Sequence, residues 1–135
     1  MESNSLLVIG AGGLGCRWAR AAHSRVPSES DLMLVDADIE SFKGASNAHC
    51  MHLDPTGMEK GIAALPALAA HRTISALEEI DQVLTSAELV VILTGLGGGT
   101  GTGSTIELAR ASKQRGAIVV VVAGLPFAEQ SFRAR

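Results

Sequence analysis

Aromatic residues are scarce in this chain, which contains no tyrosine, one tryptophan and three phenylalanines among 135 residues. Proteins that bind single-stranded nucleic acid stack the bases on aromatic side chains and neutralise the phosphates with a basic surface. Here the aromatic fraction is only 3% and the formal net charge is −3. We therefore expect no nucleic acid among the partners of this protein.

Long hydrophobic runs and a cysteine framework are also missing. No apolar run approaches the roughly 20 residues that cross a bilayer, and the N-terminal stretch MESNS does not resemble a signal peptide. Two cysteines are too few for a disulfide scaffold and fit a reducing compartment. His49, Cys50 and His52 lie close together but match no zinc spacing, so we expect no metal site in the chain itself. These absences predict a cytoplasmic protein without a membrane span, folded as a single domain over residues 1–135.

Four short apolar runs are present, at residues 6–10, 31–38, 88–95 and 117–124. Each run is continuous, which is typical of strands buried on both faces of a parallel sheet. Helix-like patterns lie between them, at residues 16–25, 73–87 and 104–116, and residues 39–72 predict an edge strand, a loop and a helical turn. The alternation predicts an α/β fold, a three-layer, Rossmann-like, doubly wound and mostly parallel sheet.

Two glycine clusters stand where a predicted strand meets a predicted helix. GAGGLG at residues 10–15 matches G-x-G-x-x-G, and Asp36 follows at the end of the second strand. GLGGGTGTGS at residues 95–104 is richer in glycine and adds hydroxyl groups. A glycine turn lets backbone amides approach a phosphate, and the next helix adds its partial positive charge. Two such loops suit a nucleotide with a polyphosphate chain, although no G-K-[ST] of a Walker A loop is present.

The stretch GGGTGTG at residues 97–103 resembles the signature loop of the tubulin/FtsZ family, in its FtsZ form. VIGAGGLG, LVDAD and the P-F…E…R ending are similar to the first phosphate loop of that family, its N-T-D-like turn and the segment after its next strand. The resemblance implies a GTPase domain of a cell-division or cytoskeletal protein that binds GTP or GDP, with Mg²⁺ as a companion ion. It also implies self-association or an FtsZ-like partner.

By the same resemblance, the nucleotide-binding residues are Gly12, Gly13, Leu14, Gly15, Asp36, Asp38, Gly97, Gly98, Gly99, Thr100, Gly101, Thr102, Gly103, Glu129 and Arg133. The first glycine segment corresponds to the diphosphate site and the second to the phosphates further along. Glu129 and Arg133 correspond to residues near the ribose, while Asp36 and Asp38 correspond to positions facing ribose or magnesium-bound water.

The family domain continues into a central helix and a carboxylate-bearing loop that have no counterpart in this sequence. We therefore expect a short or truncated family member that does not hydrolyse GTP alone. Three other interpretations stay open at this point. VIGAGGLGC with LMLVDAD is similar to ThiF-type adenylyltransferases, which use ATP, and a plain NAD-binding domain shares the first glycine pattern. The third is a non-catalytic interaction module that contacts a longer FtsZ-like filament through an uncovered apolar sheet face.

Overall fold

The computed structural model describes residues 6–27, 29–54, 66–96 and 99–125. In chain order these residues form β1 (Leu6–Ala11), α1 (Gly12–His23), β2 (Asp31–Asp36), the 3-10 helix η1 (Ile39–Phe42), β3 (His49–His52), α2 (Pro66–Ser75), α3 (Leu77–Leu84), β4 (Leu89–Gly95), α4 (Gly99–Gln114) and β5 (Ile118–Gly124). Among the described helices, none combines the length and the apolar character that crossing a bilayer requires.

All strand pairs in the described part of the chain are parallel, and the sheet order is β3-β2-β1-β4-β5. The chain builds outward from β1 to β3, then returns to place β4 on the other side of β1. The carboxyl ends of β1 and β4 therefore lie side by side, with Ala11 opposite Thr94. In open α/β sheets, ligands bind in the crevice at this point of reversal.

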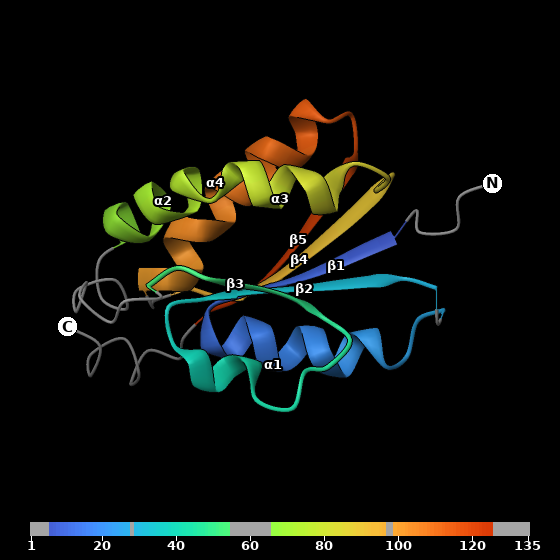
Figure 1. Ribbon diagram of the computed structural model, residues 1–135, viewed down its shortest axis with the longest axis horizontal. Helices are drawn as coiled ribbons and strands as arrows, with labels where there is room; N and C mark the ends of the chain where they lie inside the picture. The colour runs from blue at the N-terminus through green and yellow to red at the C-terminus, as the bar shows by residue number, and fades with distance from the viewer. Residues whose placement is uncertain (1–5, 28, 55–65, 97–98, 126–135) are drawn as a thin grey trace.

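Helices cover the sheet from both sides (Figure 1). α1 and η1 lie on one face, and α2, α3 and α4 lie on the other. One core cluster joins β1, β2 and β4 to α3 and α4, and a second joins Val8 and Leu34 to Cys16 and Ala19 of α1. This arrangement confirms the predicted three-layer α/β fold.

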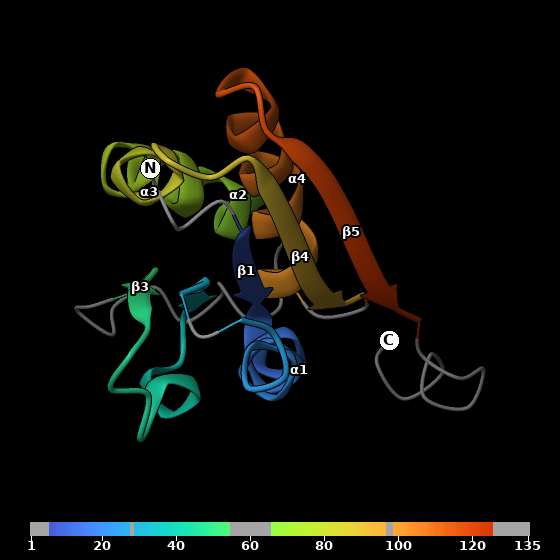
Figure 2. The same cartoon turned by 90° about the vertical axis from the view of Figure 1, so that its right-hand side faces the viewer.

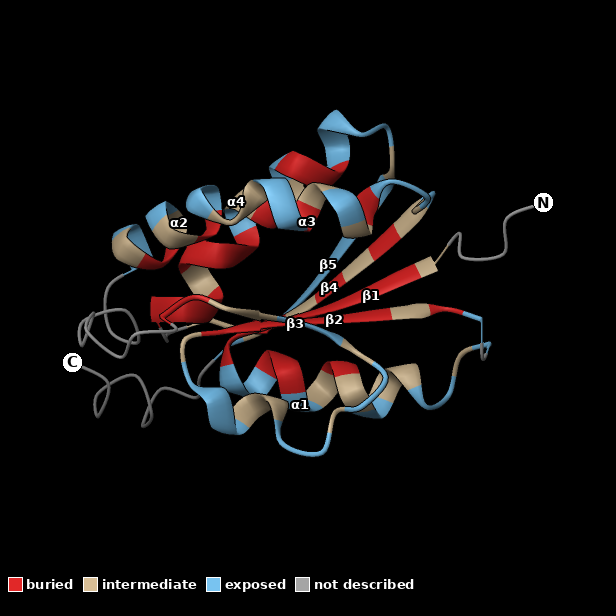
Figure 3. Ribbon diagram, viewed as in Figure 1, coloured by how far each residue is buried: buried red, intermediate tan, exposed pale blue. Residues whose placement is uncertain are grey.

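Burial differs sharply between the central strands and β5 (Figure 3). β1 and β2 are almost entirely buried, as predicted, whereas most residues of β5 are exposed. The prediction of burial on both faces is therefore wrong for β5. β5 and β3 form the two edges of the described sheet (Figure 2). α1 packs mainly against β1, β2 and β4, and it reaches β5 where Trp18 lies beside Gly124.

Three helix boundaries also differ from the sequence prediction. α1 begins at Gly12 rather than at residue 16, and α4 begins at Gly99 rather than at residue 104, so both glycine segments are partly helical. The helix predicted over residues 73–87 is divided at Ala76, whose φ and ψ are −98° and 5°, into α2 and α3. β3 agrees with the edge strand predicted within residues 39–72.

Candidate functional site

β1 passes directly into α1, with no loop between Ala11 and Gly12. Gly12 has a φ of +78°, a backbone conformation that favours glycine and that here turns the strand into the helix. Ala11 offers no side-chain cap, and the first turn of α1 contains no acidic residue. The first amide groups of α1 therefore keep their hydrogen-bonding capacity for a ligand, at the positive end of the helix.

The first turn of α4 packs against this strand-to-helix turn. A Cβ atom on Gly12 would lie 3.0 Å from the backbone nitrogen of Gly101. A Cβ atom on Gly101 would lie 2.6 Å from Thr94 Oγ1 and 3.1 Å from the Ala11 carbonyl oxygen. Glycine at both positions lets the backbones approach this closely. Two helix N-termini are thus brought together at the carboxyl ends of β1 and β4.

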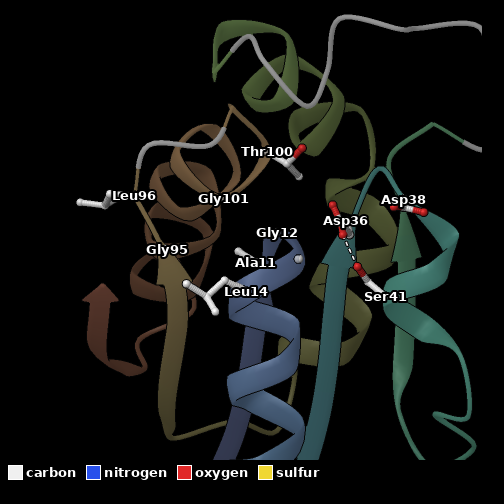
Figure 4. Close-up of a pocket in the computed structure, with 11 residues that line it drawn as sticks. Ala11, Gly12, Leu14, Asp36, Asp38, Ser41, Gly95, Leu96, Thr100 and Gly101 are labelled. Atoms are coloured by element: carbon white, nitrogen blue, oxygen red, sulfur yellow. Dashed lines mark hydrogen bonds between the residues drawn. The ribbon is translucent and has the colours of Figure 1, made fainter. Parts of the chain in front are cut away.

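A cavity of about 370 Å³ opens at this meeting point (Figure 4). We call it the glycine pocket; it is lined by Ala11, Gly12, Gly13, Leu14, Asp36, Asp38, Ser41, Gly95, Leu96, Thr100 and Gly101. Small side chains and backbone make up most of the lining, and the two aspartates are its charged members. Such a wall recognises a ligand mainly through backbone amides.

The two aspartates are held by η1, which follows β2. Asp36 is buried, and its carboxylate accepts hydrogen bonds from the amide of Ala37 at 2.8 Å and from the hydroxyl of Ser41. Figure 4 shows the Asp36 and Ser41 side chains facing each other. Asp38 caps η1, with its Oδ1 accepting from the amide of Glu40 at 3.0 Å. η1 therefore positions both carboxylates on one side of the glycine pocket.

Thr100, in the first turn of α4, provides an unpaired polar group among the residues that line the pocket. Its side chain is only 5% exposed, and its Oγ1 has no hydrogen-bond partner within the part of the chain that the structure describes. Neighbouring threonines are paired, since Thr105 Oγ1 donates to the Gly101 carbonyl at 2.7 Å and Thr94 Oγ1 to the Ala11 carbonyl at 3.3 Å. A buried hydroxyl without a partner costs about 1–3 kcal/mol, a cost that a bound ligand can remove.

The structure brings together about half of the residues predicted from the sequence. Those that line the glycine pocket are Gly12, Gly13, Leu14, Asp36, Asp38, Thr100 and Gly101. Those placed in α1 or α4 but not among the lining residues are Gly15, Gly99, Thr102 and Gly103. Gly97, Gly98, Glu129 and Arg133 lie outside the described residues. A nucleotide contact remains a prediction at every one of these positions, including those that line the glycine pocket.

Four lining residues were not predicted: Ala11, Ser41, Gly95 and Leu96. Ala11, Gly95 and Leu96 lie within the two glycine clusters, so their place in the sequence was an available signal. Ser41 had none, because the fold of η1 back toward β2 brings it to the pocket.

Cys16 lies behind the pocket, on the inner face of α1. It is 1% exposed, and its thiol donates to the carbonyls of Gly10 and Val35, each at 3.6 Å. Burial, reinforced by the negative charge of Asp36, raises the pKa of Cys16 to about 12. The thiolate that a nucleophile requires is therefore suppressed at neutral pH.

His49, Cys50 and His52 lie on the edge strand β3. His52 Nε2 lies 2.9 Å from the Ala37 carbonyl oxygen, and its ring meets that of Phe42 edge-on. Within the described residues, no cluster of three histidine, cysteine or carboxylate side chains is arranged to hold a metal ion.

Comparison with known proteins supports one of the interpretations that the sequence left open. The model of the "Tubulin/FtsZ family, GTPase domain" matches residues 5–135. The chain is 31% identical over 122 residues to the cell division protein FtsZ of Pseudomonas aeruginosa, covering 89% of this chain and 31% of that protein. It is 28% identical over 125 residues to FtsZ of Haloferax mediterranei, covering 91% and 33%.

Solved structures give the same result. An empty FtsZ dimer from M. jannaschii superposes with a TM-score of 0.80 at 27% identity, covering 96% of this chain and 38% of that chain. CetZ from Methanosaeta thermophila has the same fold, with a TM-score of 0.78 at 22% identity, covering 94% of this chain and 38% of that chain. The present chain spans about a third of the length of the curated relatives it matches. With the family model matched over residues 5–135, this chain belongs to the tubulin/FtsZ family and corresponds to its GTPase domain.

Proposed function

We propose that this chain binds a guanine nucleotide, GTP or GDP, with its phosphates in the glycine pocket. The observation that carries the proposal is the meeting of the α1 and α4 N-termini beside the unpaired hydroxyl of Thr100. Helix N-termini attract phosphate through free amides and partial positive charge. The choice of guanine follows from membership of a family whose domain is a GTPase domain.

Magnesium accompanies the nucleotide in this proposal. Asp36 and Asp38 are the charged residues that line the glycine pocket, so a bare polyphosphate would meet two like charges. A divalent cation with oxygen ligands offsets that repulsion and suits carboxylate and phosphate oxygens. We therefore expect nucleotide affinity to fall when magnesium is chelated.

We also propose that the chain alone does not hydrolyse GTP. Hydrolysis needs a water molecule held in line and a group that accepts its proton. The Asp36 carboxylate already accepts two hydrogen bonds, and Asp38 is committed to capping η1. These contacts hold each carboxylate against its own segment, and in this proposal neither acts as the general base. Phosphate release from GTP should therefore stay at the rate of the uncatalysed control, and release proportional to protein concentration would contradict this.

Isothermal titration calorimetry tests the binding proposal. The chain is titrated with GTP, GDP, ATP and NAD, each in the presence of Mg²⁺. GTP and GDP should bind at least about tenfold more tightly than ATP or NAD, a difference of about 1.4 kcal/mol. Selective binding of ATP would instead support the adenylyltransferase interpretation, and selective binding of NAD would support the dinucleotide interpretation.

The exposed edge strand β5 favours a second role, association with another copy of the chain. Ile118, Val120 and Val122 share one face of β5 and are 69%, 45% and 46% exposed. Exposed apolar side chains on an edge strand are a typical site of pairing with another chain. One structural relative is an FtsZ dimer. We propose that this chain self-associates through β5.

Light scattering after size exclusion tests this second role. The measured mass should rise with protein concentration, and Val120→Lys should lower it because a charge on the edge opposes strand pairing. Ile106→Lys, at an exposed position of α4, is the control for an added surface charge. A mass of one chain at every concentration would contradict the role of β5.

A further inference from the structure

The segment that joins β2 to η1 carries both charged residues of the glycine pocket, and several contacts fix it to the rest of the fold. The amide of Leu53 donates to the Asp36 carbonyl at 2.9 Å, just beyond the pairing of β3 with β2. Arg20 Nη1 of α1 donates to the Ser41 carbonyl at 3.3 Å, and the Ser41 hydroxyl donates to the Asp36 carboxylate. These contacts account for the position of Asp36, and Asp38 is held by a different set.

Asp38 is joined to β2 through Ala37. The Ala37 carbonyl belongs to the peptide group between Ala37 and Asp38, and its oxygen lies 2.9 Å from His52 Nε2 on the edge strand β3. A carbonyl oxygen accepts and does not donate, so Nε2 carries the hydrogen in this contact. His52 therefore fixes the orientation of the peptide group from which Asp38 begins.

The ring of His52 is also in contact with η1. Phe42, the last residue of η1, meets it edge-on, with the ring centroids 6.0 Å apart and the ring planes at 82°. This is a favourable geometry for two aromatic rings. Phe42 packs in addition against the core cluster on the α1 face of the sheet. His52 thus contacts the chain on both sides of Asp38, at Ala37 before it and at Phe42 after it.

Asp38 depends on this support because its own side chain is not enclosed. The residue is exposed, and its Oδ1 accepts one hydrogen bond, from the Glu40 amide at 3.0 Å. A carboxylate has about four acceptor sites in all, so this contact leaves capacity for a divalent cation, which takes oxygen ligands. The place of the carboxylate in the pocket is therefore set mainly by the backbone on which it stands.

We propose that His52 is a positioning residue for magnesium-dependent nucleotide binding, acting through the Ala37 carbonyl on Asp38. The inference rests on the binding of a nucleotide and of Mg²⁺ proposed above. His52 does not line the glycine pocket, so it touches neither the nucleotide nor the cation in this arrangement. Residues that orient the ligands of a cation in this way change its affinity about 10–100-fold when they are replaced.

Titration calorimetry with GTP, in Mg²⁺ and again in excess chelator, tests the role of His52. His52→Leu removes the donor and should weaken GTP binding in Mg²⁺ about tenfold. In chelator the variant and the unmodified chain should agree within about twofold, because Asp38 then holds no cation. The side-chain amide of His52→Gln keeps a donor for the Ala37 carbonyl, so this variant should recover most of the lost affinity.

His49→Leu is the matched control, because His49 lies on the same strand, is exposed and does not line the glycine pocket. It should leave GTP affinity unchanged in both conditions, and circular dichroism checks that each variant is folded. An equal loss with and without Mg²⁺, no loss in His52→Leu, or no recovery in His52→Gln would overturn the inference. Nitrogen-15 NMR of the unmodified chain adds a readout without substitution. The His52 hydrogen should lie on Nε2 and exchange slowly with water, and a hydrogen on Nδ1 alone would contradict the contact.

The proposals fail in different ways. If GTP binds the unmodified chain in neither condition, the proposed function fails and the role of His52 fails with it. If GTP binds equally well with Mg²⁺ and with chelator, nucleotide binding stands, and the roles of the cation and of His52 are both wrong. If the affinity depends on Mg²⁺ and His52→Leu leaves that dependence unchanged, only the role of His52 is wrong.

Discussion

The two glycine-rich helix starts of this protein occupy equivalent places in the sheet and differ in what surrounds them. Gly12, Gly13 and Leu14 open α1 after β1, while Gly99, Thr100 and Gly101 open α4 after the neighbouring strand β4. In the first turn of α1, Gly13 and Leu14 are exposed. The three residues that open α4 are all buried.

The space around Gly13 and Gly101 shows how the two helix starts differ. A Cβ atom on Gly13 would lie 3.9 Å from Asp36 Oδ2, its nearest neighbour among the described residues, whereas a Cβ atom on Gly101 would collide with Thr94. The glycine at 101 is required for packing between α4 and the strands. Packing does not require glycine at position 13, and the lack of a side chain there leaves the glycine pocket open.

The largest effect on stability is expected from Gly101→Val, at the buried start of α4. The new side chain would meet Thr94 Oγ1 and the Ala11 carbonyl, and overpacking of this kind should outweigh the gain in helix propensity. We expect a loss of about 3 kcal/mol in the free energy of unfolding, measured by urea denaturation. Ile106→Val, at an exposed position of the same helix, should change it little. Unchanged stability of Gly101→Val would show that the start of α4 is not tightly packed.

Alkaline pH should lower the stability of the folded chain through Cys16, on the inner face of α1. Below pH 9 the thiol of Cys16 is protonated in the folded and unfolded chains alike, and its raised pKa of about 12 keeps it protonated in the folded chain at higher pH. Between pH 9 and about pH 12 the Cys16 thiol is deprotonated in the unfolded chain and still protonated in the folded chain. The free energy of unfolding therefore falls by about 1.4 kcal/mol per pH unit in this range. By pH 10.5 the loss should reach about 2 kcal/mol.

Urea denaturation between pH 8 and 10.5 measures this loss, and the absence of tyrosine removes one other group that titrates in this range. Cys16→Ala should flatten the profile, although it lowers stability at pH 8 through the cavity it leaves. Cys50→Ser, at an exposed position, should keep most of the slope. A steep profile in Cys16→Ala would assign the alkaline loss to other groups.

At the start of α1, where Gly13 is exposed, Gly13→Ala should change nucleotide binding rather than stability. A methyl group at this position meets no close neighbour and favours the helix, so stability should stay the same or rise by up to about 1 kcal/mol. The same methyl group lies in the lining of the glycine pocket and should weaken GTP and GDP binding about tenfold, measured by calorimetry. If Gly13→Ala unfolds the chain while binding per folded molecule is unchanged, the contrast between the two segments is wrong.

The smallest effect is expected from Thr100→Val, which tests whether the packed segment also contributes to binding. Valine keeps the shape and removes the unpaired hydroxyl, so stability should be unchanged or slightly higher. Nucleotide affinity should fall about fivefold, close to 1 kcal/mol, because one ligand hydrogen bond is lost. Thr94→Val is the matched control, since it removes a hydroxyl that bonds to the Ala11 carbonyl and should lower stability instead. Equal affinities for Thr100→Val and the unmodified chain would exclude the hydroxyl from ligand binding.

Sequence patterns predicted the central strands and the three-layer class well, because continuous apolar runs between helical patterns are a local signal. The start of α4 was predicted too late, since the low helix propensity of glycine obscured a turn that packing makes helical. The exposure of β5 was missed for a similar reason. Its composition matches that of a buried strand, and only the tertiary structure shows that α1 packs mainly against β1, β2 and β4 and leaves most of β5 exposed.

The candidate site, like the fold, was predicted from the sequence only in part. Residues in the two glycine segments and at the end of β2 were predicted because their residue types and order carry the family pattern. Ser41 could not be predicted, because η1 reaches Asp36 through a fold of the chain that no local pattern encodes.

The linear order of residues was enough to identify an α/β domain of the tubulin/FtsZ family and the two glycine segments at its centre. It could not show which segment is open and which is tightly packed, because a glycine looks the same in the sequence whether open space or other residues of the chain surround it. Gly13 lies open at the glycine pocket and Gly101 is packed against Thr94 and Ala11, and this difference arises from contacts between residues far apart in the chain. Long-range packing decided which glycines are available to a ligand.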